Sequence, residues 1–399
     1  MVFSSHSPYR IPLGIGAAIT LLVMASAWSQ GSEEEEDAFK QARNLYRDAA
    51  DYATAAELLA DFIRNYPASK RLPEARLLLA RSYKNNQRCD LAIDAYEVFY
   101  QKHPENLSTP EARQERALCL NLEGRHLDAA RAYEEVQRRF SASEFAAPVL
   151  LEAAANYTYA EKPGQAARLY GLAITEYGDK SQAHTARYHL ARLLFAQGES
   201  DAAQRLLEEI VTAGAPEAPS ALLLSGGIDL FLGRVDAARR AFARLHERFR
   251  TSAQADSAYL ELAFYLYDQR QFSQAEEAFQ TAYKRIKNTA LKLDARLGLA
   301  DALRLRGSTG PALDHYQALA KILPPADPGR DRAQLGLAIT YGQTGAFTMA
   351  FNLFQQLIET GPDTPEAIAS FRELGMLYQR RGDYNGAIPW YSHYLQAAS

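Results

Sequence analysis

The sequence predicts an all-α solenoid of about ten helix-turn-helix repeats, and three observations carry that prediction. An alanine recurs at intervals of 35 to 38 residues. A leucine or an aromatic residue follows it by four positions, and alanine or glycine precedes it by twelve in nine of the ten repeats, the exception being Arg43. A regular period of this length indicates a repeat protein, in which each repeat packs only on its neighbours. The recurring alanines, called anchors below, are Ala55, Ala92, Ala129, Ala166, Ala203, Ala238, Ala275, Ala312, Ala350 and Ala387.

The first 27 residues have the features of a signal peptide. Arg10 supplies a positive charge, Ile11–Met24 is an uncharged apolar run, and Ala25-Ser26-Ala27 is a small-x-small cleavage pattern. We therefore expect a signal peptide over 1–27, an acidic linker over 28–36 and the solenoid over 37–399. The alternative is an uncleaved segment, which would associate with a membrane through residues 11–27.

Offsets from each anchor predict two helices in every repeat. The anchor and the residues four and seven positions after it share one face of a second helix. Residues nine and twelve positions before it form the buried stripe of a first helix. We expect Thr109 and Thr364, each followed by proline and glutamate, to cap first helices. Glycine five positions before the anchor is expected to end the first helix in six repeats, at Gly124, Gly198, Gly233, Gly307, Gly345 and Gly382.

Composition and motifs argue against several classes of function. A net charge of -4 provides no basic field for phosphates, so we expect no nucleic-acid partner. The histidines are scattered, and no metal-binding spacing, phosphate loop or nucleophile motif accompanies them. We therefore predict no enzyme, no cofactor and no metal.

The repeat pattern resembles tetratricopeptide repeats, as the final repeat illustrates with Leu374-Gly375, Tyr378, Gly382-Asp383-Tyr384, Ala387 and Tyr391. The period is about three residues longer than the usual 34 of that family. The resemblance implies a right-handed superhelix that binds proteins on a concave surface. Phe62–Pro67 and the helix start at Pro73 resemble bacterial cell-envelope members, of the Tol-Pal-associated and outer-membrane assembly types. That likeness implies export to the periplasm or cell envelope of a bacterium.

In this family the concave groove is lined by first helices, at positions fifteen, eleven, eight and seven before each anchor. The resemblance places Lys40, Asn44, Arg81 and Lys84 there as a polar group in the first two repeats. In repeats four to seven the same positions predict an exposed apolar strip that binds a partner protein or peptide. If the longer repeats rotate these helices, the strip is core instead. Its residues are Leu151, Tyr159, Tyr188, Phe195, Leu223, Phe231, Leu260, Phe264 and Tyr267.

Two features remain open at this stage. Cys89 and Cys119 fall at helix ends that should be adjacent, so they form either a disulfide or a pair of buried thiols. No polar helix follows the second helix of the last repeat, so we also expect docking or self-association at that C-terminal end.

The sequence thus predicts an exported protein-protein interaction scaffold in the periplasm or cell envelope, with its partner in the concave groove. The alternative function is a membrane-held structural subunit of an envelope assembly or export machine.

Overall fold

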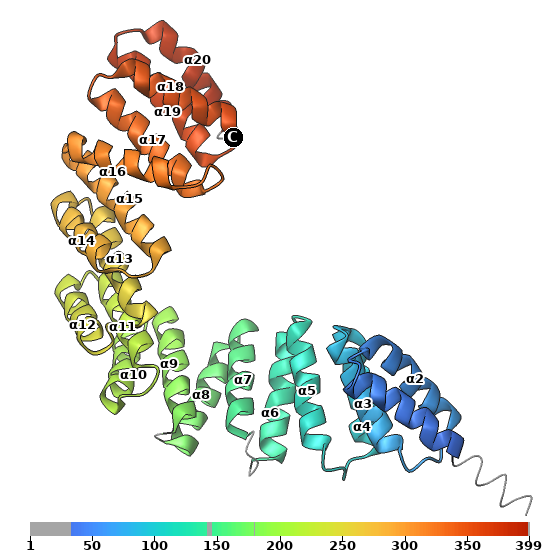
Figure 1. The fold of residues 1–399 in the computed structure, drawn as a ribbon. Coiled ribbons are helices and arrows are strands. Elements are labelled where there is room, and N and C mark those ends of the chain that lie inside the picture. The colour runs from blue at the N-terminus through green and yellow to red at the C-terminus, as the bar shows by residue number, and fades with distance from the viewer. Residues whose placement is uncertain (1–32, 142–145, 179, 398–399) are drawn as a thin grey trace, which may run out of the picture. The chain divides into compact units, whose positions relative to one another are not determined.

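The structure is a computed structural model that describes residues 33–141, 146–178 and 180–397. Throughout these ranges the regular secondary structure is helical (Figure 1). The predicted signal peptide lies outside the described residues, as do residues 28–32 of the predicted linker. The chain divides into two compact parts, residues 1–193 and 194–399, which are described separately.

The N-terminal part begins with a helix over residues 33–47. From α2 to α8 each helix packs on the next along the chain. The helices are α2 (Tyr52–Asn65), α3 (Leu72–Asn85), α4 (Cys89–Lys102), α5 (Thr109–Leu122), α6 (His126–Arg139), α7 (Ala146–Tyr159), α8 (Pro163–Tyr177) and α9 (Ser181–Ala196), which contains the division.

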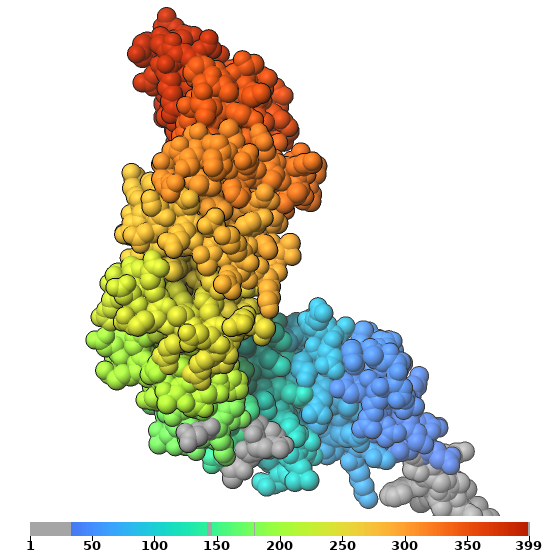
Figure 2. All heavy atoms as spheres, turned by 60° about the vertical axis from the view of Figure 1, so that its left-hand side comes forward, coloured from blue at the N-terminus to red at the C-terminus, as the bar shows by residue number. Residues whose placement is uncertain are grey.

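The C-terminal part continues the alternation of first and second helices. Its first helices α11, α13, α15, α17 and α19 also contact one another in series. In each part the colours follow the chain order, as expected where contacts join sequence neighbours (Figure 2). The helices are α10 (Ser200–Ala213), α11 (Ala218–Phe231), α12 (Val235–Arg248), α13 (Ala253–Asp268), α14 (Phe272–Arg285), α15 (Thr289–Arg306), α16 (Thr309–Ile322), α17 (Pro328–Gln343), α18 (Phe347–Thr360), α19 (Pro365–Arg380) and α20 (Tyr384–Ala397).

The anchor alanines form the core of the solenoid, as the sequence predicts. All ten are at most 3% exposed, and so is the leucine or ring four positions later in the first nine repeats. Glycines make room for three of these rings: a Cβ on Gly226 would lie 2.2 Å from the Phe242 ring. Gly298 lies similarly against Phe279, and Gly336 against Tyr316. Helices therefore approach closely where an alanine or glycine faces a large side chain.

The turn between the two helices of a repeat is left-handed in all ten repeats. The six predicted glycines have φ between 71° and 91°. The other four repeats place a non-glycine residue in this conformation, with φ between 53° and 59°, at Ala50, Gln87, Glu161 and Arg270. Thus the packing of the two helices imposes the turn even where the side chain disfavours it.

Two expectations about helix starts need correction. The acidic linker was expected to reach residue 36, but residues 33–36 are the first turn of a helix. That turn is held because Glu36 forms an ion pair with Arg71 at 3.0 Å. Thr364 caps α19 by accepting a hydrogen bond from the Ala367 amide, as predicted. Thr109 does not cap α5, because it is already helical and its hydroxyl donates to the His103 carbonyl at 2.9 Å.

None of the helices in the described ranges combines the length and the apolar character needed to cross a bilayer.

Candidate partner-binding faces

The predicted polar group of the first two repeats divides into two pairs. Lys40 and Asn44 are exposed on the helix over residues 33–47. Arg81 and Lys84 on α3 both donate to Glu115 on α5, at 2.9 Å and 2.7 Å. Burial alone would oppose ionisation of Glu115, but the hydrogen bonds from Lys84 and Arg81 together hold its pKa below the ordinary value. These two cations therefore already bind a carboxylate of the next repeat.

The predicted apolar strip is unevenly exposed in the N-terminal part. Leu151 is half-buried and packs on the core. Tyr159 is 70% exposed, with its ring centroid 5.2 Å from that of His126. Tyr188 is half-buried beside His189. Tyr159 is thus the most exposed of these three residues, whereas neighbouring side chains partly cover Leu151 and Tyr188.

Two phenylalanines from neighbouring first helices meet at the start of the C-terminal part. Phe195 is half-buried, and its ring packs edge-on against Phe231 at a centroid distance of 5.4 Å. Phe231 is 76% exposed, and Leu223 on the same helix is half-buried. The contact with Phe195 therefore holds Phe231 in place while most of the Phe231 side chain stays exposed.

The last members of the strip lie on α13, and one of them is core. Leu260 is 7% exposed and belongs to the cluster formed with α14 and α15, so its assignment as a contact residue is corrected. Leu260 is therefore core, which is the alternative that the sequence left open for the strip. Phe264 is 38% exposed and packs edge-on against Phe279, and the half-buried Tyr267 packs against the same ring.

A carboxylate on this surface escaped the sequence analysis. Glu261 on α13 is half-buried, and burial raises its pKa to about 7. Its Oε2 lies 3.4 Å from where a Cβ on Gly227 of α11 would stand. Within the described ranges no hydrogen bond or ion pair reaches this carboxylate. We call Gly227 and Phe231 of α11, with Glu261 and Phe264 of α13, the α11–α13 face.

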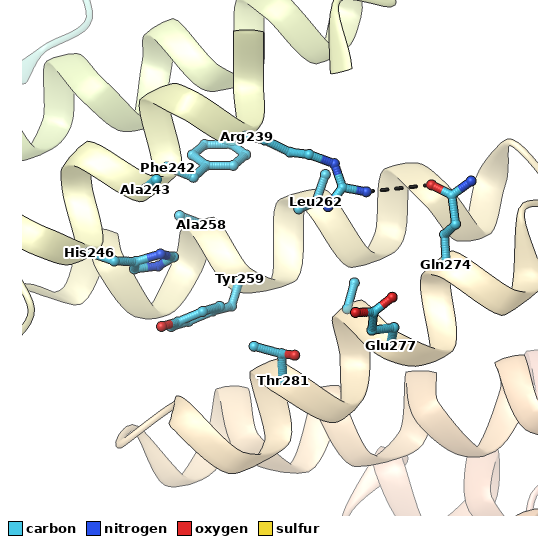
Figure 3. Close-up of a pocket in the computed structure, with 11 residues that line it drawn as sticks. Arg239, Phe242, Ala243, His246, Ala258, Tyr259, Leu262, Gln274, Glu277 and Thr281 are labelled. Atoms are coloured by element: carbon cyan, nitrogen blue, oxygen red, sulfur yellow. Dashed lines mark hydrogen bonds between the residues drawn. The ribbon is translucent and has the colours of Figure 1, made fainter. Parts of the chain in front are cut away.

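A pocket of about 250 Å³ lies between α12, α13 and α14 (Figure 3). Phe242 and Ala258 contribute apolar surface, and His246 stacks on Tyr259 with ring centroids 3.7 Å apart. His246 Nε2 donates to the Ala255 carbonyl at 2.9 Å, while burial lowers the pKa of the imidazole. The imidazole is therefore neutral near pH 7, with its proton on Nε2 and with Nδ1 as the unprotonated ring nitrogen.

The two cysteines lie together, as their positions in the repeats predict. Cys89 and Cys119 are 4% and 0% exposed, and both are free thiols in the structure. Burial, followed by a hydrogen bond with Cys89, raises the pKa of the Cys119 thiol. The disulfide stays a prediction. Among the described residues, no three histidine, cysteine or acidic side chains are arranged to hold a metal ion.

Three sequence profiles match the chain. One, described as a tetratricopeptide repeat-like domain, matches residues 99–243. Two tetratricopeptide repeat profiles match residues 228–288 and 260–331, and residues 38–69 and 74–106. Together they span nearly all of the chain from 38 to 331. No curated protein matches the sequence significantly.

Solved structures that match this chain share little sequence with it. A tetratricopeptide repeat protein from Parabacteroides merdae is 12% identical, with a TM-score of 0.43, over 66% of this chain and 98% of that one. The structure of Naa15/Naa10 bound to HypK-THB is 13% identical, with a TM-score of 0.48, over 94% of this chain and 60% of that one. PilF of Pseudomonas aeruginosa is 15% identical, with a TM-score of 0.37, over 58% of this chain and 98% of that one.

Proposed function

Because the chain belongs to the tetratricopeptide repeat family, we propose that it is a non-catalytic scaffold that binds a partner protein on its first helices. The observation that carries this proposal is the pair of rings formed by Phe195 and Phe231, of which Phe231 is 76% exposed. A large aromatic side chain left in water, and held in place by a neighbour, is typical of a protein-binding site.

The proposed compartment is the periplasm or cell envelope of a bacterium. Support comes from the sequence: Arg10, the apolar run Ile11–Met24 and the pattern Ala25-Ser26-Ala27. The resemblance of Phe62–Pro67 to envelope members of the family points the same way. In this proposal the mature scaffold begins at Trp28.

A second candidate function is a structural subunit of an envelope assembly or export machine, held at the membrane by residues 11–27. It is favoured by the length of the apolar run, which approaches that of a bilayer span. Cell fractionation with N-terminal sequencing separates the two. A soluble chain that starts at Trp28 supports the free scaffold, and a membrane-bound chain that retains residues 11–27 supports the second candidate.

Photocrosslinking in the native cell tests the binding face directly. A photoreactive residue at Phe264 is expected to capture a defined partner. The same residue at Ile322, which is 56% exposed on the second helix α16, serves as the matched control. Equal capture from both positions would contradict the proposed face.

A substitution at Phe231 complements the crosslinking. Because most of this ring is in water, Phe231→Asp should leave the fold intact and abolish capture at Phe264. Circular dichroism and a melting curve confirm the fold of the variant. A folded Phe231→Asp chain that still captures the same partner would refute the role of this ring.

A further inference from the structure

Glutamate recurs fourteen residues before the anchor, and three of these side chains are at least half-buried: Glu115, Glu261 and Glu373. Two of the three have a cation. Arg81 and Lys84 hold Glu115, and Arg372 binds Glu373 at 2.9 Å. At two of the three positions the buried carboxylate is therefore paired with a positive charge, which offsets the cost of burying its own charge.

Glu261 has no cations at the two positions from which Arg81 and Lys84 reach Glu115. Arg81 and Lys84 stand eleven and eight residues before the anchor of the repeat that precedes Glu115. The corresponding residues before Glu261 are Gly227 and Leu230. The first provides no side chain and the second no charge.

The missing side chain leaves the approach to the carboxylate open from α11. A Cβ on Gly227 would stand 3.4 Å from Glu261 Oε2, and α11 contacts α13 directly. A longer side chain reaching this point from outside would meet the carboxylate where Arg81 meets Glu115. The raised pKa of Glu261, to about 7, is the expected result of burial without a cation.

We propose that Glu261 binds a basic side chain of the partner protein, an arginine or lysine that enters over Gly227. The proposal rests on the scaffold function proposed above and adds the chemistry that its partner must carry. Phe231 lies one helical turn after Gly227, and Phe264 lies three residues after Glu261. Both rings expose surface on the α11–α13 face, so a cation flanked by apolar side chains fits it. Rings beside a cation add to the attraction of the carboxylate.

The first test supplies the cation from within the chain. Gly227 is helical with an ordinary φ, so Gly227→Arg places a guanidinium beside Glu261 without backbone strain. For the natural chain we expect the contribution of Glu261 to lower the melting temperature as the pH rises from 5 to 8, and Gly227→Arg is expected to lose this fall. Gly227→Gln is the neutral control and should keep that fall. If both variants keep the fall, a guanidinium does not fit and the inference is wrong.

The second test selects peptides on the full-length chain. Random heptapeptides displayed on phage are selected against the immobilised protein, and the recovered peptides are synthesised for affinity measurement. We expect a basic residue next to apolar ones. Binding should weaken by about tenfold or more in Glu261→Gln and in Gly227→Arg, because each removes the charge complementarity. Glu152→Gln, at the same position of repeat four but exposed, should leave binding unchanged.

The outcomes separate the inference from the scaffold function. Peptides that crosslink at Phe264 but bind Glu261→Gln as tightly as the natural chain overturn the inference and leave the scaffold function standing. A selection that yields no Glu261-dependent peptide overturns it as well. Peptides that crosslink only on other faces overturn both.

Discussion

Replacing Glu261 with glutamine should stabilise the chain at pH 8 and change little at pH 5. The folded chain holds the pKa of Glu261 near 7, against a usual value of 4.5, so it binds more protons than the unfolded chain between these values. Stability contributed by this group therefore falls as the pH rises through that window. The rise in pKa sets an upper limit of about 3 kcal/mol. Because the side chain is partly exposed, solvent screening reduces the expected effect to about 1–2 kcal/mol.

Calorimetry measures the Tm of the variant and of the natural chain at both pH values. The effect is the change in Tm caused by the substitution at pH 8, compared with the change that it causes at pH 5. For a compact part of roughly 200 residues, 1–2 kcal/mol corresponds to about 2–8 °C in Tm. Glu115→Gln is the matched control and should destabilise the chain at both pH values, because both lie above the usual pKa of 4.5. Its ion pairs hold its pKa low, so the stability it contributes is present above the usual value of 4.5 and is lost below it. A Glu261→Gln variant no more stable than the natural chain at pH 8 would refute the account of an uncompensated carboxylate.

Three further predictions concern the fold. Gln87→Gly should stabilise the chain by about 0.5–1 kcal/mol, because Gln87 has a φ of 59°, whereas Gly307→Ala should destabilise it; urea unfolding compares them. Gly226→Ala should cost about 1–3 kcal/mol, since its Cβ would overlap the Phe242 ring, and an unchanged urea midpoint would contradict this. Chain made in a reducing cytoplasm should take up no maleimide at pH 8 while folded and two labels after unfolding, because Cys89 and Cys119 are buried. The exported chain, unfolded without reductant, should take up none if the alternative of a disulfide holds, and two labels would exclude the disulfide.

The repeat boundaries were predictable because they depend on short-range periodicity. Each anchor alanine shares a helical face with the residues four and seven positions later, and that pattern survives in every repeat. The left-handed turn was visible only where glycine marks it. At Gln87 and Arg270 the conformation follows from the contact between two helices, which overrides the preference of the single residue.

The candidate site was less predictable because exposure depends on neighbours in space. Leu260 and Phe264 are one helical turn apart and equally apolar, yet α14 and α15 bury the first and leave part of the second in water. The different roles of two glutamates were not predicted for a related reason. Glu115 and Glu261 look alike along the chain, and they differ only when each is compared with the first helix of the preceding repeat.

The rings that rest on glycines restrict which repeats can be removed or exchanged. Phe279 and Tyr316 each fill the space above a glycine fourteen residues before the following anchor, Gly298 and Gly336. Deleting residues 299–336 keeps such a match, because Phe279 still meets Gly298. Deleting residues 336–372 instead removes Gly336 and brings Tyr316 to Glu373, so this ring loses the glycine that it covers. A repeat is therefore removed with least disturbance where the ring keeps such a glycine.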